Sequence, residues 1–291
     1  MQRIGIVTDS HSSLSPALAR ELGVMMLPMP FIIDGESYLE GVDLTREIFF
    51  EKLTSDAQVA TSQPAPADVL AIWDEALTRF EKILYMPLSS GLSSSCQAAQ
   101  ALSQEEPYAG RVLVVDHGRI ATPLHRSILD ALELIDRGLE AERIRDILTA
   151  DRDRVVIYLA VQTLEYLKRG GRITSAAAAV GTLLSIKPVL HLATGKLEPF
   201  KKCHGFHKAK LAMLEAVRDD MHTRFADELS RGEIYLMAAS SASPEETRAW
   251  VDEIRAAFPG MDVLCDDLSL GVCCHTGAGA LGVGFSCRPK A

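Results

Sequence analysis

Four short polar segments carry hydroxyl, carboxylate or imidazole groups at places where an α/β protein would hold a ligand. They are Thr8-Asp9-Ser10, Thr61-Ser62-Gln63-Pro64, residues 89–95 (SSGLSSS) and residues 275–279 (HTGAG). Each follows an apolar segment or lies between two predicted elements, where such folds place their binding residues. Each also has an ordinary interpretation, because turns and helix starts select the same small polar residues.

Taken together, these segments indicate a receptor for one anion. A helix start offers backbone N–H groups and serine hydroxyls, and the helix dipole favours negative charge there. None of the four segments contains a lysine or arginine, unlike a phosphate site built from cations. Neutral donors of this kind suit a carboxylate whose binding energy comes mainly from elsewhere in the ligand.

Two other classes of function remain as alternatives. Ser93, His275 and Asp9 could form the triad of a serine acyl hydrolase. The usual nucleophile elbow, G-x-S-x-G, is absent, because serine stands at position 95 where its second glycine belongs. Ester turnover that disappears in Ser93→Ala would favour the hydrolase, whereas a shallow polar pocket without lipid would favour a small-molecule or sugar-binding module.

Nucleotide-binding motifs are incomplete in this sequence. Residues 277–282 (GAGALG) match the dinucleotide fingerprint G-x-G-x-x-G, but only nine residues follow Gly282. The motif needs a helix, a second strand and an acidic residue after it. The phosphate loop G-x-x-x-x-G-K-[ST] does not occur. We therefore expect no nucleotide site on this chain, and any phosphoryl-transfer machinery would belong to a partner.

The cysteines do not predict a disulfide framework or a metal site. The six cysteines are scattered and include no C-x-x-C pair, so buried free thiols are expected. Cys273, Cys274 and His275 are the one cluster with metal-binding side chains. On a predicted strand over residues 271–275, neighbouring side chains point to opposite faces and cannot converge on one ion. No metal and no cofactor is expected.

The elements that must position these residues alternate between strands and helices over the first half, as in a parallel sheet with helices on its faces. Ser15-Pro16 predicts a helix start, because serine caps the first turn and proline fits its first position. Asp34-Gly35 predicts a tight turn. Strands are expected at residues 4–8, 25–33, 83–87 and 112–116, and helices at 15–23, 43–53, 66–80 and from 95 onward.

From about residue 151 the pattern changes. The apolar segments 190–193 and 197–202 flank Thr194-Gly195 and predict an antiparallel hairpin. Ser243 and Glu246 predict a capping box at a helix start. Further strands are expected at 155–161, 234–239, 263–268 and 271–275, and helices up to Lys168, at 175–184 and at 208–229. We expect an α/β fold of two domains, residues 1–150 with a parallel sheet in α/β/α layers and residues 151–291 with a mixed sheet.

Composition excludes several classes of protein. The chain has 291 residues, 47% of them hydrophobic and 24% charged, which suffices for a sizeable core. Its net charge of -9 argues against nucleic-acid binding, which needs a basic surface. The first residues lead into an apolar strand without a signal-peptide pattern, and the longest apolar run, 176–186, falls short of the ~20 residues of a membrane span. We expect a soluble cytoplasmic protein without an integral membrane segment.

At these same residues the sequence resembles the DegV family, which includes the fatty-acid-binding subunits of bacterial fatty acid kinase. Seven segments in the family's order carry the resemblance, and they extend over nearly the full chain. They are 6–10 (IVTDS), 38–44 (YLEGVDL), 61–64 (TSQP), 89–93 (SSGLS), 164–173 (LEYLKRGGRI), 184–190 (LSIKPVL) and 275–282 (HTGAGALG).

The resemblance implies a bacterial lipid-binding protein that is not an enzyme. Its long-chain fatty acid would be buried in the N-terminal domain, with the carboxylate at the domain interface and the second domain closing over it. Thr61 and Ser93 would hydrogen-bond the carboxylate, assisted by the backbone N–H of Ser94 and approached by His275 and Thr276. The carboxylate would be presented to a separate fatty acid kinase for phospholipid metabolism.

Basic residues in the second half would serve the kinase partner. The resemblance implies a docking surface at Arg169, Arg172, Lys202 and His204. Basic residues before a glycine also close helices, which is the ordinary interpretation of the first two. At position 204 the family commonly has an arginine, so this chain departs from the pattern there. It departs also at Ser94, Ser95 and Ala278, where glycine, threonine and proline are usual.

Overall fold

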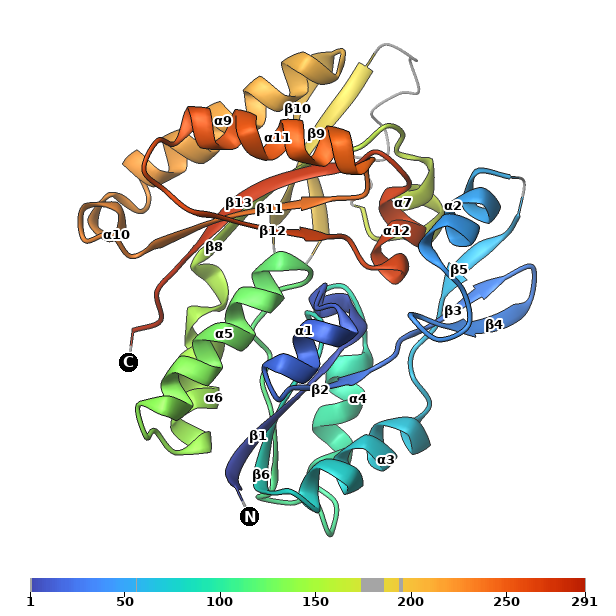
Figure 1. Ribbon diagram of the computed structural model, residues 1–291, viewed down its shortest axis with the longest axis vertical. Helices are drawn as coiled ribbons and strands as arrows, with labels where there is room; N and C mark the ends of the chain where they lie inside the picture. The colour runs from blue at the N-terminus through green and yellow to red at the C-terminus, as the bar shows by residue number, and fades with distance from the viewer. Residues whose placement is uncertain (1, 56, 174–185, 194–195, 291) are drawn as a thin grey trace. The chain divides into compact units, whose positions relative to one another are not determined.

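The computed structural model describes residues 2–55, 57–173, 186–193 and 196–290 (Figure 1). Their contacts divide the chain into two compact units. Unit 1 comprises Met1–Asp153 with Ser269–Gly271 and Pro289–Ala291, and unit 2 comprises Arg154–Leu268 with Val272–Arg288. Each unit has β-sheet structure and a hydrophobic core of its own.

The main sheet of unit 1 has four parallel strands in the order β2-β1-β6-β7. They are β1 (Gln2–Asp9), β2 (Met25–Leu27), β6 (Phe80–Met86) and β7 (Val112–Val114). Successive side chains enter opposite faces, so Ile6 and Leu84 pack on one face and Val7 and Tyr85 on the other. Because both faces are buried, these strands appear in the sequence as unbroken apolar runs.

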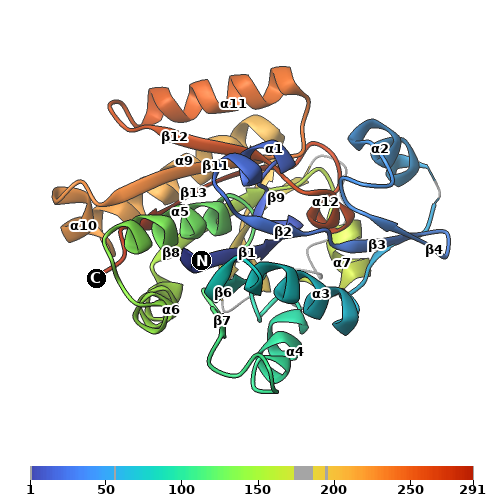
Figure 2. The ribbon, with the colours of Figure 1, turned by 60° about the horizontal axis from the view of Figure 1, so that its bottom comes forward.

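Helices cover both faces of this parallel sheet (Figure 2). One face packs against α3 (Pro66–Leu77) and α4 (Ser95–Leu102), and the other against α1 (Pro16–Glu21), α5 (Thr122–Asp136) and α6 (Ala141–Ala150). As predicted, Ser15 caps α1: its Oγ accepts a hydrogen bond from the N–H of Leu18 at 3.1 Å. The helices α5 and α6 were not predicted from the sequence.

A small antiparallel sheet in the order β4-β3-β5 completes unit 1. It contains β3 (Pro30–Ile33), β4 (Glu36–Leu39) and β5 (Val59–Thr61), and α2 (Arg46–Thr54) lies between β4 and β5 in the chain. Asp34 and Gly35 connect β3 to β4 with φ angles of 51° and 87°. Positive φ at both positions is what a type I′ hairpin turn requires, so the predicted turn is confirmed.

Unit 2 is built on one six-stranded mixed sheet in the order β10-β9-β8-β13-β11-β12, with only β11 and β12 parallel. Its strands are β8 (Val155–Ala160), β9 (Ile186–Ala193), β10 (Lys196–His204), β11 (Ile234–Ser240), β12 (Val263–Asp267) and β13 (Leu281–Cys287). The antiparallel pairing of β9 with β10 confirms the predicted hairpin. The predicted α/β class, with a parallel sheet first and a mixed sheet second, is also confirmed.

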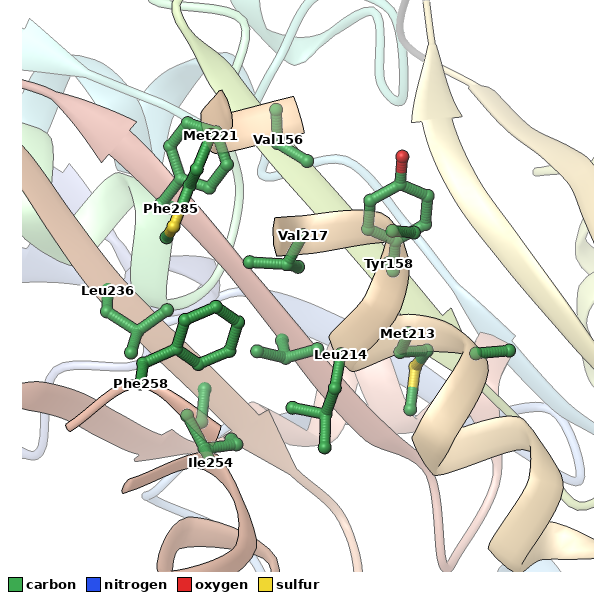
Figure 3. Packing of buried hydrophobic residues seen from close by; sticks show 14 of the residues in the cluster. Val156, Tyr158, Met213, Leu214, Val217, Met221, Leu236, Ile254, Phe258 and Phe285 are labelled. Atoms are coloured by element: carbon green, nitrogen blue, oxygen red, sulfur yellow. The ribbon is translucent and has the colours of Figure 1, made fainter. Parts of the chain in front are cut away.

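The core of unit 2 lies between this sheet and two long helices, α9 (Phe206–His222) and α11 (Pro244–Ala257). Figure 3 shows Met213, Val217 and Met221 of α9 packed with Tyr158 of β8 and Phe285 of β13. The predicted capping box starts α11, because the Ser243 side chain accepts from the Glu246 N–H and the Glu246 carboxylate accepts from the Ser243 N–H.

Two predicted elements of unit 2 are wrong. The expected strand over 271–275 is a helix, α12 (Leu270–Thr276), and the last strand of the sheet is β13. The expected helix over 208–229 is divided into α9 and α10 (Ala226–Ser230). The short helix before Gly171 is confirmed as α7 (Glu165–Gly170), with Gly171 in the left-handed conformation at φ 65°. The helix expected over 175–184 lies outside the described residues.

Candidate functional site

The strand order of unit 1 places two of the polar segments at one edge of the parallel sheet. The chain leaves β1 for β2 on one side and returns to β6 on the other, so the connections diverge between β1 and β6. Ligands of parallel α/β sheets bind at the carboxyl ends of the strands at such a point. Asp9 ends β1, and residues 89–95 follow β6.

Asp9 links the loops that follow β1 and β6 through hydrogen bonds. Its buried carboxylate accepts a hydrogen bond from the N–H of His11 at 3.0 Å and another from the N–H of Leu88 at 2.8 Å. The neighbouring Thr8 hydroxyl donates to the carbonyl of Met86 at 2.8 Å. Both side chains therefore join the ends of β1 and β6, and the turn-and-capping interpretation of Asp9 fits better than a role in a catalytic triad.

The Thr61 and Ser94 segments lie next to each other in unit 1. Thr61 ends β5 opposite Phe31 of β3, and its side chain is half-buried. Two residues later the Gln63 side-chain amide donates to the hydroxyl of Ser94, which ties the two loops together. Hydroxyl groups from separate stretches of sequence are thus brought to one region, as an anion receptor requires.

Ser93 lies two residues before the start of α4 and is half-buried. Its hydroxyl accepts the Ser95 N–H at 3.2 Å, and its own N–H donates to the Ser89 carbonyl at 3.2 Å. Ser94 is the residue before the helix and makes no side-chain capping bond to it. The segment therefore combines a helix start with serine hydroxyls, the arrangement that favours a bound anion.

His275 belongs to unit 2 and lies on α12, one residue before its end. Its half-buried imidazole packs against Gly170 at the end of α7: a Cβ atom at position 170 would lie 2.0 Å from Nδ1 of His275. The hydroxyl of Thr276 is turned inward and donates to the carbonyl of Val272 at 3.3 Å. Of these two predicted residues, His275 is the more exposed.

The glycine motif that follows His275 leads into a strand. Gly277 and Gly279 have φ angles of 74° and 73° and form the turn before β13. In a dinucleotide site the same motif opens a helix. All six cysteines are free thiols, and all but the half-buried Cys265 are buried. Within the described ranges no group of three or more His, Cys, Asp or Glu side chains is arranged to hold a metal ion.

The four basic residues assigned to kinase docking lie at two separate places in unit 2. Arg169 is exposed beside Glu165 at 3.7 Å, and Arg172 donates to the carbonyl of Gly170 at 2.5 Å. The Arg172 carbonyl accepts the Leu197 N–H near the start of β10, whereas Lys202 and His204 lie exposed at its other end. His204 lies seven positions after Leu197 along the strand, a span of about 20 Å.

Glu40 is a residue of unit 1 that sequence reasoning missed. Its carboxylate accepts from the Ser10 hydroxyl at 2.7 Å and from the N–H of Leu270. Burial raises the pKa of Glu40, although His11 and Ser10 lower it in part. Glu40 could have been found from the sequence because it lies in residues 38–44 (YLEGVDL), one of the segments that carry the family resemblance. Leu270 is assigned to unit 1 together with Glu40, and His275 is assigned to unit 2.

Among the described helices, none has the length and apolar character needed to cross a bilayer.

Comparison with solved structures finds the same fold over the full chain. One described as fatty acid binding of a DegV family protein from Thermus thermophilus has a TM-score of 0.86 and 32% identity, covering 98% of this chain and 100% of that one. DegV from Bacillus subtilis, described as a fatty acid binding protein, has a TM-score of 0.84 and 26% identity, covering 99% of this chain and 100% of its own.

Sequence comparison gives the same result. The DegV domain-containing protein of Halalkalibacterium halodurans is 31% identical over 288 residues, which cover 98% of this chain and 99% of that protein. A family model described as "Uncharacterised protein, DegV family" matches residues 3–288. Because both matches extend over nearly the whole sequence, the chain belongs to the DegV family.

Proposed function

We propose that this protein is a non-catalytic cytoplasmic carrier that binds one long-chain fatty acid and presents its carboxylate to a partner fatty acid kinase. The observation that carries the binding role is the full-length likeness to the Thermus thermophilus protein described as fatty-acid binding, at a TM-score of 0.86 and 32% identity. The kinase role rests on the family resemblance and on the absence of a phosphate-loop motif from the sequence.

The proposal assigns the carboxylate to uncharged donors. In unit 1 these are the hydroxyls of Thr61 and Ser93 and the N–H of Ser94, on the two loops that Gln63 ties together. In unit 2 they are His275 and Thr276. A bidentate arginine would hold both carboxylate oxygens in strong charge-assisted bonds. Hydroxyl donors orient the group and leave lone pairs with which it can attack a phosphoryl group.

The acyl chain supplies most of the affinity in this proposal. Burying one methylene is worth about 0.8 kcal/mol, so a chain of ~16 carbons gains on the order of 12 kcal/mol before ordering costs are subtracted. We place this chain in the N-terminal domain, residues 1–150, with the domain of residues 151–291 closing over the carboxylate. Arg169, Arg172, Lys202 and His204 are assigned to the kinase-facing surface.

Native mass spectrometry of the purified protein and of Thr61→Ala and Ser93→Ala tests the carboxylate site. The wild-type protein is expected to carry one fatty acid. Each variant removes one hydrogen bond to a charged group, so we expect about tenfold weaker retention. Transfer of phosphate to the bound lipid by a fatty acid kinase from the same organism should fall as well.

Thr78→Ala is the matched control, because the Thr78 hydroxyl donates only within its own helix end, to the Glu75 carbonyl at 2.7 Å. It should retain lipid like the wild type. Unchanged retention and phosphorylation in both site variants would disprove the assignment. Turnover of an activated ester that is lost in Ser93→Ala would instead establish the hydrolase.

A further inference from the structure

In unit 2, α7 and the segment from α12 to β13 fit together through glycines. A Cβ atom on Gly170 would lie 2.0 Å from Nδ1 and 2.5 Å from Cε1 of His275. In the reverse direction, a Cβ on Gly277 would lie 2.7 Å from the ring of Tyr166. Real Cβ contacts are not this short, so each glycine provides the space that the opposite ring occupies.

A third contact continues the same arrangement. Gln162, before α7, donates to the Gly279 carbonyl at 3.4 Å, and a Cβ on Gly279 would lie 3.0 Å from its Cγ. Gln162, Tyr166 and Gly170 are spaced by four residues, and they meet Gly279, Gly277 and His275 in the opposite order. The two segments are therefore held in a fixed register with His275 at one end.

Backbone conformation does not account for the glycine at position 170. Gly171 is the residue that terminates α7 in the left-handed conformation, at φ 65°, and Gly277 and Gly279 also need positive φ. Gly170 has no positive φ and is the last residue of α7, so its backbone conformation is one that any residue can adopt. The requirement that remains is room for the imidazole.

The contact also distinguishes the two ring nitrogens of His275. The atoms nearest to the Cβ position of residue 170 are Nδ1, Cε1 and Cγ, so the Nδ1 edge faces α7. The residue is half-buried, and Nε2 lies farther from α7 than Nδ1 does.

We propose that Gly170 is a positioning residue: by lacking a side chain it lets the His275 imidazole lie against α7 and directs Nε2 to the fatty acid carboxylate. This inference rests on the proposed function for the identity of the ligand, but the placement of the ring does not depend on it. A methyl group at position 170 is expected to displace the imidazole, because the ring can rotate whereas the helix backbone cannot.

The test combines ring NMR with a double-mutant cycle. Long-range ¹H–¹⁵N spectra of histidine-labelled protein should show changed His275 ring signals in Gly170→Ala, identified by their loss in His275→Ala. Retention of a long-chain fatty acid should weaken about tenfold in Gly170→Ala, the value of one hydrogen bond to a charged group. In the His275→Ala background, Gly170→Ala should weaken it no further.

Gly282→Ala adds the same methyl group elsewhere in unit 2, where the nearest atoms are 3.6 Å away, and should leave the His275 signals unchanged. Unchanged signals in Gly170→Ala would overturn the inference. Changed signals with unchanged lipid retention would uphold the positioning and contradict the assignment of His275 to the carboxylate.

If the Gly170→Ala protein does not fold, the double variant Gly170→Ala/His275→Ala still tests the inference. If Gly170→Ala/His275→Ala folds where the single variant does not, the imidazole is the group that needs the space. If neither folds, Gly170 has another structural role and the inference fails.

Discussion

Two ionisable side chains, His117 and Arg119, are buried in the loop that follows β7 in unit 1. Arg119 is almost fully buried and donates to the Ser127 hydroxyl at 2.8 Å and to the Asp151 carbonyl at 3.2 Å. His117 is fully buried, and its Nδ1 accepts the Arg119 N–H at 3.0 Å. Burial, assisted by the charge of Arg119, lowers the pKa of His117 from 6.5 to about 4.

This histidine should make unit 1 sensitive to acid. Between pH 6.5 and about 4 the unfolded chain binds a proton that folded His117 does not, so the free energy of unfolding falls as the pH falls. The loss should reach about 3 kcal/mol at most. In His117→Asn, whose side-chain oxygen can accept the same N–H, this part of the pH dependence should be absent.

Wild type and His117→Asn must be compared with each other, because the titration of Asp130 changes the free energy of unfolding in the opposite direction. Burial raises the pKa of Asp130 to about 6, although Arg126 and Arg119 lower it in part. Folded Asp130 therefore binds a proton that the unfolded chain does not, which stabilises the fold as the pH falls toward 4. Urea unfolding at pH 7, 5.5 and 4 gives the difference directly, and parallel curves for wild type and His117→Asn would contradict the prediction.

The elements of unit 2 depend on close backbone approach at β13. Trp250 of α11 donates to the Gly282 carbonyl at 3.0 Å, and every residue of β13 is buried. A Cβ on Gly284 would lie 1.9 Å from the Val156 carbonyl oxygen, which is a backbone atom of the paired strand β8. At Gly282, two residues earlier on the same face, the nearest atoms are 3.6 Å away.

Gly284→Ala should therefore separate β8 from β13 and destabilise the protein by more than about 3 kcal/mol, in the range of severe overpacking. Gly282→Ala serves as the control and should stay within about 1 kcal/mol of wild type. Chemical denaturation of both variants measures the difference. Equal stabilities would show that β8 moves freely enough to admit the methyl group.

The same strand shows what the sequence could and could not predict. Residues 281–287 (LGVGFSC) alternate between large apolar and small side chains, which is a strand pattern. The glycine motif of residues 277–282 overlaps the first two residues of this strand. The short run 271–275 has no decisive period, and such runs fit a strand or a buried helix equally well.

Only those features of the candidate site that depend on residues close together in the sequence could be predicted. The serine segment before α4 and the capping box of α11 follow from neighbouring residues, and the structure has both as expected. The bond between Gln63 and Ser94, the contact of Glu40 with Leu270 and the packing of His275 on Gly170 join residues that are distant in sequence. Such contacts depend on strand order and helix packing, and the local patterns of a single sequence do not predict either of these.

For the molecule as a whole, bound lipid should raise stability by mass action. If the proposed function holds, removing the fatty acid should lower the unfolding temperature, and free ligand at a hundred times Kd should restore about 2.7 kcal/mol. Hydrogen exchange should show increased protection at residues 59–63 and 89–95 when lipid is returned. Stabilisation without added protection in these segments would place the ligand elsewhere.

The position of β13 in its sheet constrains how the protein can be made. This strand comes last in the order of elements, yet it lies between β8 and β11 and joins the two halves of the unit 2 sheet. During synthesis, β8 to β10 and β11 to β12 are complete before the strand that must connect them exists. Until residues 281–287 leave the ribosome, each half presents an open edge, so this is the stage at which a nascent chain would most need a chaperone.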